Sequence, residues 1–286
     1  MSDALRDTLS RVTVVVVTHH SAHCIPALAR NLAAFPHITV VDNASQDHTA
    51  QQVKKLMPHA KWLSLQVNVG FGTANNQALD RVSTPYALLV NPDCLITPQA
   101  AAQLVATADA QPQATIVAPQ LLDNGGRAQL NYGWPRWKWH ARGPGAEGLT
   151  SVGYACAAAW LLRCNERQWR FDSDFFLYYE DEDLCARIMA AGQEVLIDPA
   201  AVASHANRGS VKGGSVVRAE WGRGYHHSRS KILFMRKHHA PGAAQRTRQT
   251  ALWRGGLELL LRLLTLQPRL IARSAGRWVG MWHAHT

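Results

Sequence analysis

The sequence predicts an α/β protein with an open, mostly parallel twisted sheet, flanked by helices and followed by a basic helical C-terminal extension. Two observations support this prediction. Short apolar segments alternate with helix-compatible segments through residues 11–110, which is the pattern of parallel strands joined by crossover helices. From Arg208 to the end there are 15 Lys and Arg residues and only 2 acidic residues, so the net charge of +10 belongs to the C-terminal segment.

The first strand and its neighbours are the clearest elements. Val12–Val17 is a continuous apolar run, VTVVVV, typical of a strand buried on both faces. Ala22–Phe35 is compatible with a helix that has Pro26 near its first turn. Ile38–Ser45 predicts a second strand that runs into a polar turn, and Thr49–Met57 a second helix.

The alternation continues for two more strands. Lys61–Gln66 predicts a short strand, followed by the Gly-rich loop Asn68–Asn76, whose second half opens a helix to Val82. Thr84–Cys94 predicts a fourth strand that stops at Pro92, and Pro98–Ala110 a helix.

The second half is less regular. Residues 111–150 are rich in Trp, Gly and Pro and are expected to form a mobile loop over a site, with Trp134–Trp139 shaping an acceptor site. Ser151–Leu162 predicts a strand, the acidic cluster after Tyr179 begins a helix that ends near Gly192, and Glu194–Pro199 predicts another strand. We therefore expect one domain over residues 1–240, with halves at about 11–110 and 111–240, and a basic amphipathic helical tail over 241–286.

The composition excludes several classes of protein. The chain is 47% hydrophobic and 17% charged, which indicates a globular protein and not a disordered one. The five cysteines include no CxxC pair, and the N-terminus has no apolar signal core, so a cytoplasmic location is expected. No GxGxxG, GxxxxGK[ST] or GxSxG motif is present, which argues against a dinucleotide-binding Rossmann domain, a P-loop enzyme and an α/β-hydrolase.

Polar residues follow each of the first four predicted strands. They are Thr18, Asp42, Asn43, Asn68, Gly70, Asn91 and Asp93. Since ligands bind at the carboxyl ends of the strands in open parallel sheets, these residues predict a binding site there. Each one alone is equally compatible with a helix-capping role.

Two further groups predict chemistry. Asp93 and His205 both follow strands and can supply ligands to a divalent cation, although a capping turn and an ordinary loop histidine are the structural alternatives. Glu180, Asp181, Glu182 and Asp183 come directly after the apolar run Phe175–Tyr179. The helix dipole and an Asp183–Arg187 pair explain one or two of these acids, and a carboxylate at a partly desolvated helix start is suited to act as a general base.

Taken together, these motifs resemble those of the family 2 glycosyltransferases, inverting enzymes of the GT-A fold, and in particular the bacterial rhamnosyltransferase-like branch. The matching segments are VVVVTHH, VVDNASQD, NVGFGTANNQ, LLVNPDC, FDSDFFLYYEDEDLCAR and IDPAAVASHANRGS. They occur in the order typical of that family and cover roughly residues 11–235.

The resemblance implies a role for each site residue. Asp42 would contact the nucleoside, and the remaining nucleotide-sugar pocket would be formed by Thr18, Asn43, Asn68, Gly70, Asn76 and Asn91. Asp93 would bind Mg²⁺ or Mn²⁺ on the donor diphosphate, with His205 as a second metal ligand. Asn91 stands where many relatives have the first Asp of a DxD motif, which leaves fewer anionic ligands. Asp181 would be the catalytic base, and Glu180 would position donor or acceptor.

The resemblance also implies the reaction and its partners. The best match is transfer of L-rhamnose from dTDP-L-rhamnose to a hydroxyl of a glycan or lipid-linked acceptor, with dTDP-, UDP- and GDP-sugars as candidate donors. The related roles in cell-wall polysaccharide and lipopolysaccharide biosynthesis follow from that branch of the family. A nucleotide-sugar-binding regulator without catalysis and a basic nucleic-acid-binding protein are the alternatives. The chain has no recognisable nucleic-acid module, so no nucleic acid partner is expected.

The tail suggests a membrane contact. Trp253–Trp282 mixes leucines with arginines and ends in tryptophans, a composition that suits a helix lying in a membrane interface. A helix packed on the protein is the alternative. If the helix lies in a membrane interface, the protein is expected to be peripheral on the inner face of the cytoplasmic membrane.

Overall fold

The computed structural model describes residues 1–133, 145–164, 168–206, 209, 215–264 and 266–284. The predicted acceptor-shaping segment Trp134–Trp139 lies outside these residues. The chain divides into two compact units, each of which is discontinuous in sequence. The first comprises Met1–Phe171 and Leu184–Lys212, and the second Asp172–Asp183 and Gly213–Thr286. The predicted domain boundary at residue 240 stays a prediction.

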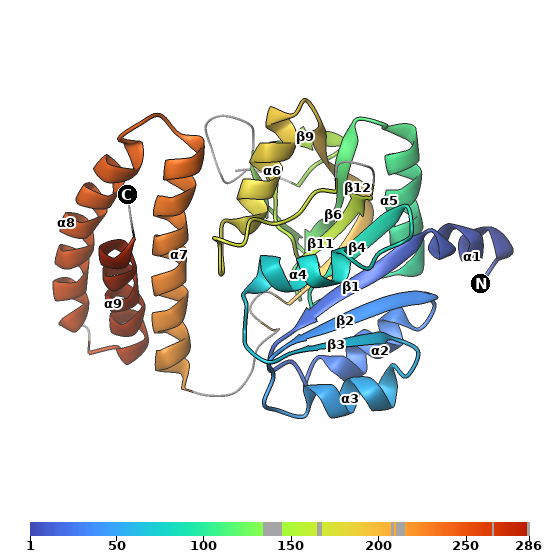
Figure 1. Cartoon of the computed structure of the whole chain (residues 1–286), viewed down its shortest axis with the longest axis horizontal. Helices are drawn as coiled ribbons and strands as arrows, with labels where there is room; N and C mark the ends of the chain where they lie inside the picture. Colours follow the sequence, from blue (N-terminus) through green and yellow to red (C-terminus); the bar gives the residue numbers. More distant parts are fainter. Residues whose placement is uncertain (134–144, 165–167, 207–208, 210–214, 265, 285–286) are drawn as a thin grey trace. The chain divides into compact units, whose positions relative to one another are not determined.

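A mixed, mostly parallel sheet forms the centre of the first unit (Figure 1). Among the described residues its ten strands have the order β3-β2-β1-β4-β11-β6-β12-β5, with β7 beside β6 and β9 beside β12. Strands β3, β2, β1 and β4 run parallel, as do β6 and β12, whereas β11 and β5 run antiparallel to their neighbours. The strands are β1 (Val12–Thr18), β2 (His37–Asn43), β3 (Lys61–Leu65), β4 (Tyr86–Val90), β5 (Cys94–Ile96), β6 (Ala114–Leu122), β7 (Ala128–Gln129), β9 (Thr150–Val152), β11 (Ala159–Arg163) and β12 (Glu194–His205). A separate ribbon pairs β8 (Tyr132–Gly133) with β10 (Tyr154–Ala155).

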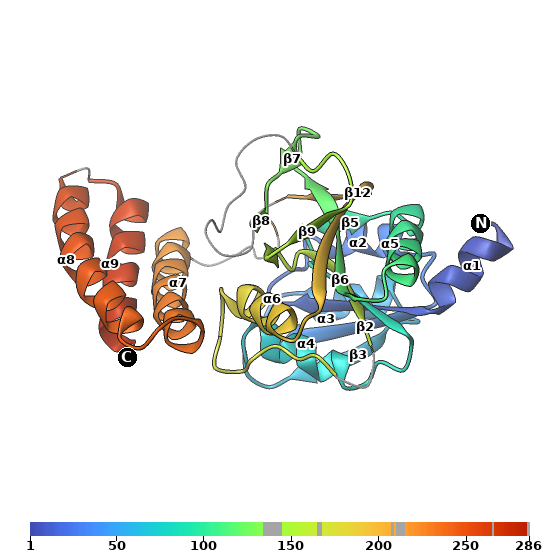
Figure 2. The ribbon, with the colours of Figure 1, turned by 90° about the horizontal axis from the view of Figure 1, so that it is seen from above.

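Helices cover both faces of this sheet, which explains the unbroken apolar run in β1. Val14 and Val16 pack in one core cluster, and Val15 and Val17 in the cluster on the opposite face, because side chains alternate along a strand. Figure 2 shows α2 and α5 on one side of the sheet and α4 on the other. The helices of this part of the chain are α1 (Asp3–Ser10), α2 (Ile25–Leu32), α3 (Thr49–Leu56), α4 (Phe71–Leu79), α5 (Pro98–Ala110) and α6 (Glu180–Ala190).

The predicted strand Thr84–Cys94 is in fact two strands, so that prediction is corrected. Strand β4 ends at Val90, and Asn91-Pro92-Asp93 forms a turn closed by a hydrogen bond from Cys94 N–H to Asn91 O (2.9 Å). Pro92 has no N–H to continue a ladder. Beyond the turn, β5 pairs with β12 instead of β1, which moves the chain to a different part of the sheet.

The prediction of a loop over residues 111–150 is wrong at its start. There β6 forms a nine-residue, almost fully buried strand between β11 and β12. Its Pro119 is tolerated because the β6–β12 ladder has a register shift beside it, between Asp198 and Val202. The predicted strand Ser151–Leu162 is likewise divided among β9, β10 and β11, and β12 runs past Pro199 to His205.

The second unit contains three long helices, so the single tail helix expected over Trp253–Trp282 is corrected to two. They are α7 (Val216–His238), α8 (Ala243–Leu263) and α9 (Pro268–His283). Helix α9 begins at Pro268, the position where a proline best fits a helix. None of the helices within the described residues is both long enough and apolar enough to cross a membrane.

Glycines allow α7 and α9 to approach each other closely. A Cβ atom at Gly276 would lie 2.1 Å from the Trp221 carbonyl oxygen, and one at Gly280 2.3 Å from the Tyr225 carbonyl oxygen. The Ser228 hydroxyl donates a hydrogen bond to Arg277 O across this contact (2.9 Å). The backbones of the two helices therefore meet with no room for a side chain at these glycines.

Candidate functional site

The antiparallel pairing of β5 with β12 brings Asp93 and His205 together. His205, the last residue of β12, is opposite Cys94, the first residue of β5, so the residue before Cys94 lies beside the histidine. Asp93 Oδ1 is 3.8 Å from His205 Nε2, and both side chains are buried. Asp93 Oδ2 accepts a hydrogen bond from Gly209 N–H (2.7 Å), whereas Oδ1 accepts none from the described residues. A buried carboxylate oxygen with no donor is a candidate metal ligand.

Gln129 orients the histidine. Its Nε2 donates to His205 O (2.7 Å), and its Oε1 lies 3.3 Å from His205 Nδ1. Since an amide oxygen only accepts, Nδ1 carries the proton and Nε2 presents a lone pair toward Asp93. Burial lowers the pKa of His205, although the Asp93 charge acts in the opposite direction. The neutral imidazole that results is the form that binds metals.

The carboxyl ends of β1 and β2 bring Thr18 and Asp42 together. The two residues are directly opposite in the parallel ladder. Thr18 Oγ1 donates to Asp42 Oδ1 (3.1 Å), and Ser45 N–H donates to Asp42 Oδ2 (3.2 Å). Both members of the pair are buried, so the carboxylate is fixed at the strand ends.

Asn43 holds the Gly-rich loop against the end of β2. Its Nδ2 donates to Asn68 Oδ1 (2.9 Å) and to Gly70 O (3.1 Å), and its Oδ1 accepts from Val69 N–H (2.9 Å). Gly70 has φ +86°, in the left-handed region that favours glycine, at the point where α4 begins. Three of the predicted nucleotide-pocket residues thus form one hydrogen-bonded unit.

The remaining two predicted pocket residues make structural contacts. The Asn76 side chain donates to Phe171 O (2.8 Å) and accepts from Phe171 N–H (2.9 Å). Asn91 N–H donates to Ala158 O (2.9 Å), and Asn91 O accepts from Cys94 N–H (2.9 Å). Asn76 therefore fixes the segment that leads to the acidic helix, and Asn91 fixes the turn that carries Asp93.

The acidic cluster opens α6 from a strained stretch of backbone. Tyr178 and Tyr179 have φ values of +69° and +67° directly before Glu180. Two consecutive non-glycine residues in this region are uncommon and are found where the surrounding structure imposes them. The geometry aims the first turn of α6, and with it Glu180 and Asp181, independently of helix propensity.

Two of the four acids have raised pKa values. Burial, reinforced by the Asp181 charge, raises the pKa of Glu180 well above its usual range. Burial likewise raises the pKa of Glu182 to about 8, with Asp181 adding and Lys231 opposing. Asp181 Oδ1 accepts a hydrogen bond from Glu182 N–H (3.0 Å). Burial therefore favours the protonated form of both neighbours of Asp181.

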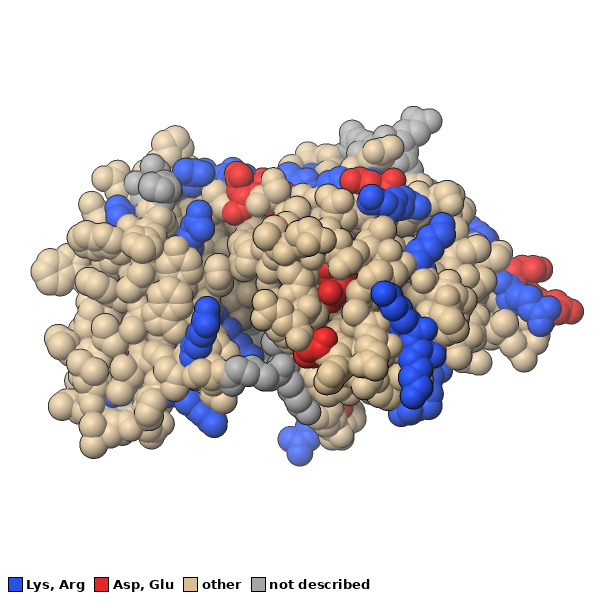
Figure 3. Space-filling model, turned by 60° about the horizontal axis from the view of Figure 1, so that its bottom comes forward, with Lys and Arg blue, Asp and Glu red and all other residues tan. Residues whose placement is uncertain are grey.

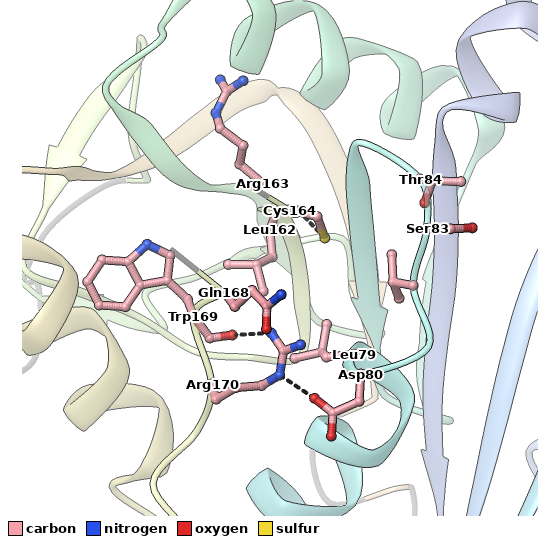
Figure 4. Close-up of a pocket in the computed structure, with 11 residues that line it drawn as sticks. Leu79, Asp80, Ser83, Thr84, Leu162, Arg163, Cys164, Gln168, Trp169 and Arg170 are labelled. Atoms are coloured by element: carbon pink, nitrogen blue, oxygen red, sulfur yellow. Dashed lines mark hydrogen bonds and ion pairs between the residues drawn. The ribbon is translucent and has the colours of Figure 1, made fainter. Parts of the chain in front are cut away.

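A separate cavity of about 460 Å³ in the first unit does not involve any of these residues (Figure 4). It is lined by residues that precede β4, by the end of β11 and by residues that follow it, including Asp80, Arg163 and Arg170. Those are the opposite ends of the strands from the predicted site. An Arg170–Asp80 ion pair of 2.8 Å spans part of its wall, so the cavity is distinct from the site at the strand ends.

The sequence did not point to Gln129 or Gly209. Gln129 lies in a two-residue strand, and Gly209 acts through its backbone N–H, so neither leaves a motif. The predicted residues are brought together as Asp93 with His205, Thr18 with Asp42, and Asn43 with Asn68 and Gly70. These belong to the first unit, whereas Glu180 and Asp181 belong to the second, and each group is described by itself.

The chain is similar to known proteins in both sequence and fold. The family model "Glycosyl transferase family 2" matches residues 13–165. A curated relative from Mycobacterium tuberculosis, "N-acetylglucosaminyl-diphospho-decaprenol L-rhamnosyltransferase", is 25% identical over 92% of this chain and 94% of its own length.

Solved structures show the same fold. A Pyrobaculum calidifontis structure described as "Mannosyltransferase PcManGT … in complex with GDP-Man and Mn2+" aligns with a TM-score of 0.57 and 17% identity, over 95% of this chain and 86% of that one. "S. aureus TarS 1-349 in complex with UDP-GlcNAc" aligns with a TM-score of 0.57 and 19% identity, over 78% of this chain and 65% of that one.

Proposed function

Since the chain belongs to glycosyl transferase family 2 and is a GT-A glycosyltransferase that uses a nucleotide-sugar donor, we propose that it transfers L-rhamnose, with inversion, from dTDP-L-rhamnose to a hydroxyl of a lipid-linked or glycan acceptor. The name of the Mycobacterium tuberculosis relative supports both the sugar and a lipid diphosphate on the acceptor. The motif order that resembles the rhamnosyltransferase-like branch is consistent with the same sugar.

The observation that carries the proposal is the unpartnered Oδ1 of Asp93, 3.8 Å from His205 Nε2. These two side chains would hold a Mg²⁺ or Mn²⁺ ion, which would neutralise charge on the departing diphosphate. Among the described residues no cluster of three or more His, Cys, Asp or Glu could hold an ion. Two protein ligands suit an ion that also binds substrate phosphates. The Mn²⁺ and GDP-mannose named for the Pyrobaculum structure support this assignment.

The nucleotide would occupy the ends of β1, β2 and β3. Asp42, fixed by Thr18 and Ser45, would accept hydrogen bonds from the nucleoside. The Asn43–Asn68–Gly70 unit would form a second wall, because its amides hold the loop in one conformation before any ligand arrives. A preformed pocket reduces the ordering cost of binding.

Asp181 would act as the general base. Its carboxylate would take the proton of the acceptor hydroxyl, whose oxygen forms the new bond to the anomeric carbon as the bond from that carbon to the diphosphate oxygen breaks. One displacement inverts the carbon and needs no enzyme nucleophile. The raised pKa values of Glu180 and Glu182 support this assignment, because a neighbour whose pKa is raised places less negative charge beside Asp181. Glu180 would position donor or acceptor.

A binding experiment followed by a turnover experiment tests the proposal. Thermal unfolding is recorded with dTDP, UDP and GDP, each with and without Mn²⁺, and stabilisation is expected to be greatest with dTDP and Mn²⁺ together. Nucleotide sugars are then screened by mass spectrometry with a lipid extract as acceptor. Transfer of a sugar from UDP or GDP alone would contradict the rhamnosyl assignment, whereas stabilisation by DNA and by no nucleotide would contradict the whole proposal.

We also propose that the second unit makes a peripheral contact with the inner face of the cytoplasmic membrane. Helix α8 and its C-cap residue expose large apolar side chains, of which Trp253 is 84% and Leu264 79% accessible. Exposed apolar surface flanked by basic residues supports an interfacial helix.

A further inference from the structure

Helix α8 has an apolar stripe on its exposed surface. The stripe consists of Trp253, Leu257, Leu260 and Leu261 of α8 and its C-cap residue Leu264, all more than half accessible. Their spacing of three and four residues places them on one side of the helix. Figure 3 shows uncharged residues over much of the C-terminal helices, with Lys and Arg side chains standing singly among them. We refer to these five residues as the α8 stripe.

A basic pocket lies in the same unit, between α7, α8 and α9. Its volume is about 470 Å³. It is lined by four basic side chains, Lys231, Arg246, Arg254 and Arg277, together with Thr247, Thr250 and one acid, Glu258. Arg254 lies between Trp253 and Leu257 in the sequence, so the pocket and the α8 stripe share a border on one helix. We refer to this cavity as the basic pocket.

The one acid that lines the basic pocket compensates only part of its positive charge. Glu258 is 3.7 Å from Arg277 and 3.8 Å from Arg262, and it accepts a hydrogen bond from Ser274 Oγ (3.1 Å). Within the described residues, Lys231, Arg246 and Arg254 have no acidic side chain at ion-pair distance. These three cations form no close ion pair with a described residue, although Lys231 also acts electrostatically on Glu182. Together with the threonine hydroxyls they form a site suited to phosphate oxygens.

The helices that form the basic pocket are packed firmly enough to keep it open. Trp278 Nε1 donates to Leu252 O (3.2 Å), and Cβ atoms at Gly255 and Gly256 would each lie 3.5 Å from the Trp278 ring. The close glycine contacts between α7 and α9 fix the third wall. The backbone positions that carry the cations are therefore fixed within the unit, and a multivalent anion between the side chains is the complementary ligand.

We propose that the basic pocket binds the phosphate or diphosphate headgroup of a membrane lipid while the α8 stripe enters the apolar layer of the bilayer. A free anion would account for the pocket but not for the apolar residues on its border, whereas a phosphorylated lipid accounts for both. The inference rests on the membrane contact proposed above, which it deepens, and does not depend on which sugar is transferred.

The test uses the full chain and sedimentation with vesicles. Binding is measured to phosphatidylcholine vesicles with and without phosphatidic acid, whose headgroup is a phosphate monoester. We expect Arg246→Gln/Arg254→Gln to weaken binding to the acidic vesicles by about tenfold or more, since each basic residue near an anionic surface contributes on the order of 1 kcal/mol. Thermal melting checks that the variant is folded.

The matched control removes two charges elsewhere in the unit. Arg218 and Arg269 are exposed and do not line the basic pocket, and Arg218→Gln/Arg269→Gln should weaken binding less than about threefold because distant charges are screened. Equal losses in the two double variants would overturn the pocket, leaving only general electrostatic attraction.

Further experiments distinguish a lipid headgroup from a free phosphate anion as the ligand. They also separate this inference from the proposed function. Leu257→Gln/Leu260→Gln/Leu264→Gln should release the protein from vesicles without changing its melting temperature. If pyrophosphate in solution binds the wild type as tightly as the acidic vesicles do, the lipid assignment is overturned. Failure of the wild type to bind any vesicle would overturn both the membrane contact and the lipid pocket. Turnover of a nucleotide sugar with a water-soluble acceptor reports on the transferase activity separately.

Discussion

Oδ1 of Asp183 lies 2.7 Å from Nε2 of His238 and joins the first turn of α6 to the last turn of α7. Asp183 is 1% accessible, so this histidine is an important partner for a carboxylate that has little access to water. Of the four consecutive acids, this one therefore has a structural contact, which joins the start of α6 to α7 within the second unit. Substitution of Asp183 or its partner and of Asp181 can distinguish the carboxylate with a structural role from the one proposed as the base.

The first prediction concerns this contact. His238→Ala should destabilise the second unit by about 1–3 kcal/mol, because it removes a hydrogen-bond contact of the buried Asp183 carboxylate. Urea unfolding measures the change. His239→Ala, an exposed neighbour in the sequence, is the control and should stay close to the wild type. Equal stability of the two variants would show that the Asp183–His238 contact contributes little.

The second prediction concerns the proposed base. Asp181→Asn should lower kcat by about 10²–10⁴-fold, the usual contribution of a general base, while the nucleotide affinity stays within a few-fold of the wild type. Steady-state kinetics and calorimetric titration of the nucleotide give the two quantities. Near-normal turnover in Asp181→Asn, or a loss confined to nucleotide affinity, would remove Asp181 from the role of base.

The third prediction concerns the residue that orients His205. Gln129→Ala should weaken Mn²⁺ binding about tenfold or more in the presence of nucleoside diphosphate, since outer partners of ligating histidines typically contribute that much. Asp93→Asn should weaken it further. Calorimetric titration of Mn²⁺ provides the measurement, and Gln51→Ala, at an exposed glutamine of α3, is the control. Unchanged Mn²⁺ affinity in Gln129→Ala would separate Gln129 from the metal site.

The fourth prediction compares one substitution at two glycines. Gly276→Ala places a methyl group against the Trp221 carbonyl oxygen and should destabilise the second unit by about 1–3 kcal/mol. Gly222→Ala, on α7, meets nothing within 4 Å, and should instead stabilise the unit by up to about 1 kcal/mol through helix propensity. Chemical unfolding distinguishes the two, and stabilisation of both variants would mean that α7 and α9 separate readily.

The fifth prediction is a pH dependence due to Glu182. Its pKa of about 8 in the folded protein exceeds the ordinary value of 4.5, so the folded state binds the proton more tightly than the unfolded state. The associated stabilisation is present below pH 4.5 and is lost as the pH rises to about 8. The loss amounts to at most about 1.4 kcal/mol per pH unit. Glu182→Gln should flatten this part of the stability curve, and an unchanged slope would assign the proton to another group.

Most helices and strands of residues 11–110 could be predicted because local sequence patterns encode them. Strand β1 is an uninterrupted apolar run, and α5 has Thr97 as its N-cap, which accepts from Ala100 N–H (3.1 Å) ahead of Pro98 at the first turn. Strand β6 was missed because Pro119 argues against a central strand, and its acceptance depends on an irregularity in β12 that only the tertiary structure reveals.

For the candidate site, the sequence could supply residues but not their contacts. Asp93 and His205 could be proposed from their positions after strands, but their proximity depends on β5 turning to run antiparallel to β12. No sequence pattern predicts the contact between Gln129 and His205, because the two residues are 76 positions apart and Gln129 lies in a two-residue strand. Interactions that depend on pairing between distant segments cannot be predicted from local periodicity.

The discontinuous course of the second unit has a practical consequence for chimeric enzymes. The acidic segment Asp172–Asp183 belongs to the same unit as α7–α9, although about thirty residues of the first unit, Leu184–Lys212, separate them in sequence. A graft that exchanges only the last three helices between relatives would sever the Asp183–His238 contact. Transfer of the whole second unit between such enzymes should therefore need two segments exchanged together, one short and internal, the other C-terminal.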